Sequence, residues 1–368
     1  MRIGILTSGG DCPGINATIR GVCKTAINYY GMEVVGIHSG FQGLLTKDVE
    51  SITDKSLSGL LNLGGTMLGT SREKPFKKGG VVSDVDKPSL ILQNIREMEL
   101  DCVVCIGGNG TQKTAAKFAA MGVNIVSVPK TIDNDLMGTD HTPGFGSAAK
   151  YVAASILEVV HDSLIYQLQS VTIIEIMGRN AGWLTGAAAL AKTEECEGPD
   201  LIYLPEIAFD VEDFLAKVKE LLQKKSSIVI AVSEGIKLAD GRYVCELSGG
   251  GDYVDAFGHK QLQGTAAYLA GFLGAEIGCK TRSVEFSTLQ RSASHMASRV
   301  DIEEAFMVGG AAVKAADEGD TGKMIVIDRV SDDPYMAKTG IYDVHRIANE
   351  EKVVPRNWMN KDASYVTK

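Results

Sequence analysis

The feature that most constrains this chain is a short apolar run that ends in a glycine-rich turn and leads into an amphipathic helix. Residues 3–7 form such a run before Gly9 and Gly10, and apolar residues then recur at helical spacing over 15–27. The pattern returns at residues 102–106, which precede the turn 107–110 and an expected helix over 112–121. Further strands are expected at 34–37 and 123–128. Strands that turn through glycine into helices are typical of a parallel doubly wound sheet.

The pattern repeats with less glycine beyond residue 140. We expect helices over 148–163, 183–191 and 211–224, and strands over 171–176 and 227–232. A strand after about residue 280, a helix over 301–318 and a strand over 324–327 follow, and the polar residues after about 330 carry no clear pattern. The sequence therefore predicts an α/β protein with two similar doubly wound three-layer α/β/α lobes. We expect parallel-type sheets and an active site in the cleft between the lobes.

Charge and cysteine usage narrow the class of protein. The 368 residues carry a formal net charge of −9, which argues against nucleic acid or an anionic membrane as partner. No apolar run approaches the ~20 residues of a membrane helix, and no signal-peptide pattern follows Met1. Seven scattered cysteines are typical of free thiols in a reducing compartment, and Cys102 and Cys105 fit a buried strand better than a metal or redox site. We therefore expect a cytoplasmic protein.

Two of the glycine-rich turns are candidate phosphate-binding sites. The turn at Gly9 and Gly10 and the turn at 107–110 each offer free backbone N–H groups at the start of a helix. Either could equally be a tight turn without function. Neither is followed by the Lys-Ser/Thr pair of a Walker A loop, and neither matches the GxGxxG fingerprint of a dinucleotide-binding oxidoreductase.

A third turn, PKTIDND at residues 129–135, carries the strongest chemical signal. If the segment is extended, Thr131, Asp133 and Asp135 lie on one side. One carboxylate would take the proton from an attacking hydroxyl while the other holds that base or a metal ion. The alternative is a solvated acidic turn, which Asn-Asp sequences often form.

The motifs GGDCPGINA, LGTSRE, IGGNGT, PKTIDND, IEIMGR and SEG, in this order and spacing, resemble the phosphofructokinase family. The resemblance runs from residue 1 to about residue 300. It implies a larger nucleotide-binding lobe at 1–138 plus about 290–345 and a smaller sugar-phosphate-binding lobe at about 139–289. A C-terminal extension would cover about 346–368.

The family's functional residues carry over position by position. The resemblance implies Asp133 as the general base that takes the proton of the 1-hydroxyl of fructose 6-phosphate, with Thr131, Asp135 and Arg179 as further catalytic residues. It implies nucleotide binding by Gly9, Gly10, Arg72, Lys77, Gly108, Asn109, Gly110, Thr111 and Gln112. It implies sugar-phosphate binding by Thr131, Asp133, Met177, Gly178, Arg179, Glu234, Arg282 and Arg291. One of these arginines crosses from a neighbouring subunit in the family, so we expect a homodimer or homotetramer.

Two positions bear on the phosphoryl donor, because the family divides into users of ATP and of pyrophosphate. Pyrophosphate users typically carry Asp at the position of Gly110, where it would collide with and repel the nucleotide's α-phosphate. Lys130 resembles the pyrophosphate group and some ATP-dependent members, and it excludes neither donor. The open glycine favours ATP, with pyrophosphate as the alternative.

The chain departs from the family at several positions. Asn109 stands where an acid usually helps to hold Mg²⁺, so donor phosphates, water and Asp11 or Asp135 would contribute more. Ser170 replaces a phosphate-binding arginine, Thr288 replaces a histidine or tyrosine, and the segment after Arg291 is altered. Ser170, Thr288 and the altered segment lie on the acceptor side of the site. The resemblance therefore implies the type of reaction more strongly than it implies fructose 6-phosphate as the acceptor. The departures also keep open a non-catalytic sugar-phosphate or nucleotide sensor on the same fold.

Overall fold

The computed structural model describes residues 1–71, 73–77, 86–165, 168–248, 262, 264–347 and 350–367. The chain divides into two compact units. Unit 1 comprises Met1–Ile132, Leu136–Ser147 and Arg291–Glu350, and unit 2 comprises Asp133–Asp135, Ala148–Gln290 and Glu351–Lys368. Each unit is an α/β structure built on its own sheet, so the predicted fold class is confirmed.

Unit 1 contains a seven-stranded sheet in the order β11-β10-β5-β4-β1-β2-β3. Its strands are β1 (Arg2–Ser8), β2 (Glu33–Ile37), β3 (Val49–Ile52), β4 (Cys102–Gly107), β5 (Ile125–Pro129), β10 (Lys323–Asp332) and β11 (Tyr335–Asp343). The neighbouring pairs from β10 to β2 are parallel, whereas β3 and β11 pair antiparallel at the two edges. These two edge strands were not predicted, because each lacks a buried apolar run.

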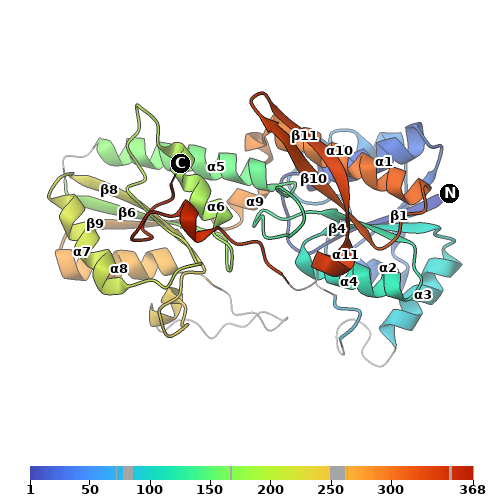
Figure 1. Cartoon of the computed structure of the whole chain (residues 1–368), viewed down its shortest axis with the longest axis horizontal. Coiled ribbons are helices and arrows are strands. Elements are labelled where there is room, and N and C mark those ends of the chain that lie inside the picture. The colour runs from blue at the N-terminus through green and yellow to red at the C-terminus, as the bar shows by residue number, and fades with distance from the viewer. Residues whose placement is uncertain are drawn as a thin grey trace. The chain divides into compact units, whose positions relative to one another are not determined.

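Helices cover both faces of the unit 1 sheet, as Figure 1 shows. They are α1 (Ile15–Asn28), α2 (Phe41–Thr46), α3 (Lys87–Glu97), α4 (Asn109–Ala120), α10 (Arg299–Asp317) and α11 (Val344–Ile347). Helices α1 and α10 pack together on one face, and α2, α3 and α4 lie on the other (Figure 1). Close contact between α1 and α10 depends on glycine: a Cβ on Gly21 would lie 2.2 Å from the Phe306 carbonyl oxygen. Leu6, Val103 and Phe118 belong to the apolar core under α2–α4.

Unit 2 contains a four-stranded, all-parallel sheet in the order β7-β8-β6-β9. Its elements are α5 (Phe145–Leu164), which begins in unit 1, β6 (Ser170–Ile176), α6 (Trp183–Gly186), β7 (Leu201–Tyr203), α7 (Val211–Leu222), β8 (Ser227–Ser233), α8 (Thr265–Ile277), β9 (Lys280–Glu285) and α9 (Leu289–Ser292), which ends in unit 1. Asp210 caps α7 by accepting hydrogen bonds from the Glu212 and Asp213 amides, each at 2.9 Å. Phe214 of α7 and Leu273 of α8 pack on the strands in one buried core.

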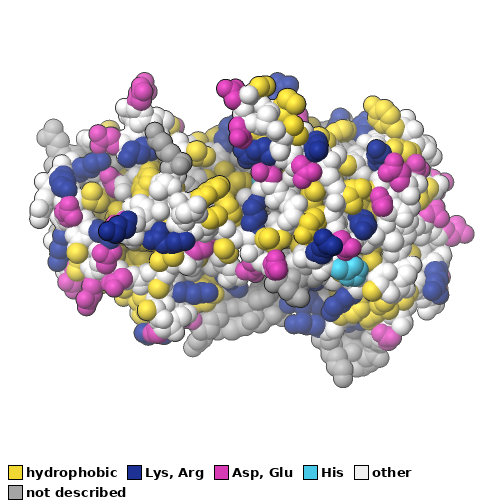
Figure 2. Space-filling view, viewed as in Figure 1, with side chains coloured by type: hydrophobic (Ala, Val, Ile, Leu, Met, Phe, Trp, Pro, Cys, Tyr) yellow, Lys and Arg dark blue, Asp and Glu magenta, His cyan; other side chains and the backbone are white. Residues whose placement is uncertain are grey.

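The cysteines are thiols rather than disulfides, and charges of both signs lie on the surface. Cys102 and Cys105 are buried in β4, as predicted, and all seven cysteines are free thiols. On the face drawn in Figure 2, Lys and Arg side chains are interspersed with Asp and Glu among the coloured residues. No helix in the described parts of the chain has the length and apolar character needed to cross a membrane.

Candidate active site

Three parallel strands of unit 1 end at the same edge of the sheet. Ser8 of β1 pairs in register with Gly107 of β4, and Gly107 pairs with Pro129 of β5. β1 and β4 are neighbours in the sheet, and the strands that follow them, β2 and β5, lie on opposite sides of this pair. The carboxyl ends of β1 and β4 therefore flank a topological switch point. Ligands of open α/β sheets bind at such points. All three predicted turns therefore begin at one edge.

The turn after β1 is held open by its neighbours. Gly9 adopts φ 90°, a left-handed conformation that favours glycine, and its carbonyl accepts a hydrogen bond from Thr70 at 2.7 Å. The Lys130 side chain is 2% exposed and donates to the Gly10 carbonyl. Its ammonium lies 3.7 Å from the place where a Cβ on Gly9 would stand. A buried positive charge therefore lies beside the first glycine turn.

Asp11 and Arg291 complete this corner of unit 1. An Arg291 Nη1 atom lies 3.8 Å from the position of a Cβ on Gly10. Partial burial raises the pKa of Asp11, against the opposing charges of Lys130 and Arg291. Arg291 was predicted to bind the sugar phosphate, and the structure places it next to Gly10 and Asp11 in unit 1.

Helix α4 begins at the second turn with a buried, unpartnered oxygen among the described residues and an exposed glycine. The Asn109 Oδ1 atom is buried and has no hydrogen-bond partner among the described residues. Gly110 is exposed, and a Cβ added there would meet no heavy atom within 4 Å in the described part of the chain. Thr111 is buried and its hydroxyl lies 3.5 Å from the Ser8 carbonyl. The start of α4 thus presents an unsatisfied oxygen next to an unobstructed glycine.

The remaining residues that were predicted to bind the nucleotide are Gln112, Lys77 and Arg72. Gln112 is fully buried, and its amide donates to the carbonyls of Gly107 at 3.0 Å and Val128 at 3.4 Å, so it ties β4 to β5. Lys77 is exposed in the turn after Phe76. Arg72 lies outside the described residues.

The third turn is bent and is not a continuous extended segment. Strand β5 ends at Pro129, and Asn134 adopts φ 53°, so the chain bends within residues 131–135. Asn tolerates the left-handed conformation that such a tight turn requires. Burial nevertheless alternates along the turn: Thr131, Asp133 and Asp135 are partly exposed, and the residues between them are buried.

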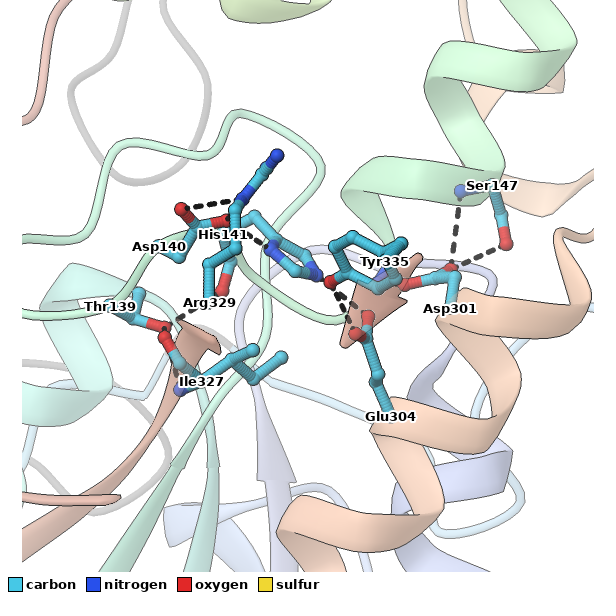
Figure 3. Close-up of polar contacts among 10 residues, drawn as sticks. Thr139, Asp140, His141, Ser147, Asp301, Glu304, Ile327, Arg329 and Tyr335 are labelled. Carbon is cyan, nitrogen blue, oxygen red and sulfur yellow. Dashed lines mark hydrogen bonds and ion pairs between the residues drawn. The ribbon is translucent and has the colours of Figure 1, made fainter. Parts of the chain in front are cut away.

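A polar network supports the chain that follows this turn (Figure 3). His141 bonds to Asp140 through Nδ1 and to Glu304 through Nε2, each at 2.7 Å. Burial opposes the charge on this imidazole, but these two carboxylates raise the pKa of His141 overall. Thr142 donates to the Thr131 carbonyl at 2.6 Å, so the network ends at the predicted catalytic turn.

In unit 2, a second group of predicted residues gathers where β6 and β8 end. Ile176 and Ser233 pair at these strand ends, and Gly178 follows β6 with φ 140°. The Ser233 hydroxyl donates to the Gly178 carbonyl at 2.5 Å. A Cβ on Gly235 would lie 2.0 Å from the Arg179 carbonyl oxygen, so only glycine fits there. Ser233 and Gly235 of the SEG motif therefore hold the loop that carries Arg179.

Glu234 lies between these contacts, in a site with unusual electrostatics. Its Oε1 accepts from the Gly178 amide at 3.5 Å. Burial, and then the like charge of Asp133, raise the pKa of Glu234 to about 7, and Arg179 opposes the rise. The predicted base, the predicted sugar ligand and Arg179 are therefore close enough to influence one another's charge.

Two supporting residues of this site were not predicted. Glu175 of β6 is 5% exposed and accepts from the Ala266 amide at the start of α8, at 2.8 Å. Burial raises the pKa of Glu175 to about 7. Gln290 is fully buried, and its Oε1 accepts from the Met177 amide at 3.3 Å. Sequence spacing gives no signal for either contact, since each joins segments far apart in the chain.

Arg282 lies apart from Glu234 within unit 2. It pairs in register with Thr172 of β6, three residues before Glu175, or about 10 Å along the strand. Its guanidinium bonds to Asp162 at 2.9 Å. With Ser170 and Lys280 it lines a shallow depression at the sheet edge. The structure of one chain does not bring Arg282 together with the other predicted sugar ligands of unit 2.

The predicted residues thus form two groups in the described structure. One lies at the β1, β4 and β5 ends of unit 1, and its members are Gly9, Gly10, Gly108, Asn109, Gly110, Thr111, Lys130 and Arg291. The other lies in unit 2, and its members are Asp133, Met177, Gly178, Arg179 and Glu234. Chain continuity connects them, because only Thr131 and Ile132 separate Lys130 from Asp133.

Comparisons with known proteins show the family to which the chain is similar. The family model Phosphofructokinase matches residues 2–316. The chain is 56% identical over 328 residues to an ATP-dependent 6-phosphofructokinase 3 of Bacteroides thetaiotaomicron, with 89% of each chain covered. It is 38% identical over 368 residues to a pyrophosphate–fructose 6-phosphate 1-phosphotransferase of Xanthomonas campestris, with 98% of this chain and 87% of that protein covered.

A solved structure gives the same picture of the fold. A pyrophosphate-dependent phosphofructokinase from Nitrosospira multiformis matches with a TM-score of 0.87 at 31% identity. The match covers 100% of this chain and 88% of the other. Relatives of both donor classes are therefore similar to this chain.

Proposed function

This chain belongs to the phosphofructokinase family, and on that basis we propose that it transfers the γ-phosphoryl group of ATP to the 1-hydroxyl of fructose 6-phosphate. The observation that carries the choice of donor is Gly110: a Cβ there would meet no heavy atom of the described residues within 4 Å. A nucleotide needs that space beside its α-phosphate. The 56% identity to an ATP-dependent relative supports the same choice.

In this mechanism Asp133 accepts the proton of the sugar 1-hydroxyl. The hydroxyl oxygen forms a bond to the γ-phosphorus, the bond from that phosphorus to the β,γ-bridging oxygen breaks, and ADP leaves. Such a transfer depends mainly on positioning and charge neutralisation. Lys130, beside the Gly9 turn, supplies a buried positive charge toward the donor phosphates, and Glu234 binds sugar hydroxyls.

Mg²⁺ fits the residues of the second turn. The buried, unpartnered Oδ1 of Asn109 is an available oxygen ligand. Mg²⁺ prefers oxygen ligands, keeps several waters, and needs few protein groups where phosphates also bind it. No three His, Cys, Asp or Glu side chains converge as a metal site within the described ranges. We therefore propose Asn109 as the protein contact of a magnesium ion that neutralises donor phosphate charge when bound.

The position of Arg282, away from the other proposed sugar ligands of unit 2, is best explained if it serves a second copy of the chain. It lies about 10 Å along the sheet from Glu175, on the edge strand β9. We propose that Arg282 binds the sugar phosphate of a neighbouring subunit in a homodimer or homotetramer. Arg291 would serve its own subunit. The free thiols support a reducing, cytoplasmic location for this oligomer.

Pyrophosphate is the second candidate donor, and the position of Lys130 is compatible with it. The Lys130 ammonium beside Gly9 would bind the phosphates of pyrophosphate as readily as those of ATP, and a relative with 38% identity uses pyrophosphate according to its name. The sensor alternative finds less support, because Asp133, Arg179 and Glu234 are all brought together in unit 2.

The assignment of the base is tested with Asp133→Asn, which keeps the shape of the side chain and removes its basicity. We expect kcat to fall by about 10²- to 10⁴-fold, with fructose 6-phosphate binding by calorimetry retained. Full activity of a folded Asp133→Asn enzyme would refute the assignment. Loss of binding and activity together would show that Asp133 mainly holds the sugar.

A further inference from the structure

The short segment 351–354, here called the C-terminal strap, contacts the catalytic turn directly. The backbone N–H of Lys352 donates to the Asp135 carbonyl at 2.8 Å. Strap and turn both belong to unit 2, although more than 200 residues separate them in the sequence. Asp135 is two residues from Asp133, so this hydrogen bond acts on the backbone that orients the proposed base.

The strap is also fixed to the loop that carries Arg179. The Trp183 indole N–H donates to the Lys352 carbonyl at 2.7 Å, and the Lys352 ammonium lies 5.2 Å from the centre of that ring. Asn180 donates to Glu351 at 3.3 Å. Lys352 therefore bonds through its N–H to the turn and through its carbonyl to Trp183, the first residue of α6, which directly follows the Arg179 loop.

A single carboxylate oxygen also joins the C-terminal strap to the Arg179 loop. Glu206 Oε1 accepts from the Gly182 amide at 2.7 Å and from the Val354 amide at 2.9 Å. Its Oε2 atom is buried without a hydrogen-bond partner among the described residues. A carboxylate held in this way is costly unless it accepts hydrogen bonds. Glu206 is thus committed to the strap and the loop.

We propose that the C-terminal strap positions the Asp133 turn relative to the Arg179 loop for phosphoryl transfer, and that Glu206 is the positioning residue that holds the strap. The inference rests on the proposed function. Base and Arg179 come from separate segments, and the strap is bonded to both. Because in-line transfer is sensitive to displacements of about 1 Å, loosening the strap should lower kcat and leave substrate affinity largely unchanged.

The test removes one backbone donor. Lys352→Pro deletes the N–H that bonds to Asp135, and Lys352→Ala is the matched control, because it keeps the N–H and removes the side-chain contacts, including the one with the Trp183 ring. We expect kcat of Lys352→Pro to fall by about 10²-fold, with KM for fructose 6-phosphate changed less than about threefold. The Ala control should retain kcat within a few-fold.

Hydrogen exchange gives a readout that does not need activity. Amides of residues 131–137 should exchange faster in Lys352→Pro than in Lys352→Ala. A folded Pro variant with normal kcat and normal exchange would overturn the proposal, as would equal losses in Pro and Ala. If wild-type enzyme transfers phosphate from neither ATP nor pyrophosphate, the proposed function fails, and the exchange comparison still decides whether the strap orders the turn.

A second pair of variants covers the case in which Lys352→Pro does not fold. Glu206→Ala removes the shared acceptor, whereas Glu206→Gln keeps an oxygen for the Gly182 and Val354 amides. A loss of kcat in Glu206→Ala that Glu206→Gln rescues supports the proposal. Wild-type kcat and exchange in folded Glu206→Ala would contradict it.

Discussion

The prediction that bears most directly on donor choice is the effect of Gly110→Asp. Gly110 is exposed at the start of α4, and a Cβ there meets no heavy atom of the described residues within 4 Å. The new Cβ therefore creates no clash within the described chain. A carboxylate in the first turn of a helix also interacts favourably with the helix dipole, by about 0.3–1 kcal/mol. Thermal unfolding should show an unchanged or slightly raised Tm.

The new charge should act on the nucleotide. A carboxylate about 4 Å from a phosphate oxygen is repelled by about 4 kcal/mol at an effective dielectric of about 20, and by about 1 kcal/mol in bulk water. Since Gly110 is exposed, a value near the middle of this range is appropriate. An energy of about 3 kcal/mol corresponds to a loss of about 10²-fold in kcat/KM for ATP.

The assay is kcat/KM for ATP at saturating fructose 6-phosphate, with Gly110→Asn as the matched control of nearly the same shape. If charge dominates, the Asn variant stays near wild type, and the loss in the Asp variant shrinks at high salt. If collision dominates, both variants lose activity. Unchanged ATP kinetics in Gly110→Asp would refute the claim that this position faces the nucleotide.

Three further predictions follow from unit 2. Glu234→Gln should remove a titration near pH 7 from the pH dependence of fructose 6-phosphate binding, because burial and the like charge of Asp133 raise the pKa of Glu234 to about 7; an unchanged binding profile would contradict this role of Glu234. Glu175 has a folded-state pKa raised to about 7 from 4.5, so its contribution to stability is present below about pH 4.5 and lost as pH rises through 7. In urea unfolding, the wild type should therefore lose about 3 kcal/mol more of its unfolding free energy between pH 4.5 and 7 than Glu175→Gln does. Equal losses in the two proteins would contradict the raised pKa of Glu175. Gly235→Ala should displace the Arg179 loop and lower kcat/KM for fructose 6-phosphate by about 10²-fold, so wild-type kinetics would show that the close contact is dispensable.

Periodicity was sufficient to predict the elements of the two cores. Apolar spacing predicted α1 because its inner face packs on α10, and unbroken apolar runs predicted β4 and β8 because both faces of these strands are buried. Strand β11 was missed because it is an antiparallel edge strand whose residues are mostly exposed or half-buried. Its partner in the sheet, β10, fixes it through backbone hydrogen bonds, which leave no apolar pattern.

The candidate site was predictable where one local motif carries it. The glycine turns and the 129–135 segment follow strand ends, and strand ends meet at one edge of a parallel sheet. The bend at Asn134 was not predictable from alternation alone. Glu175 and the Glu206 contacts were missed for another reason: they join segments that only tertiary folding brings together.

The most direct test of the proposed reaction is to supply purified enzyme, fructose 6-phosphate and Mg²⁺ with ATP or pyrophosphate in parallel, and to measure formation of fructose 1,6-bisphosphate. We expect turnover with ATP and little or none with pyrophosphate. Turnover with pyrophosphate alone would contradict the donor assignment at Gly110 and favour the charge at Lys130. Turnover with neither donor would contradict the proposed reaction itself.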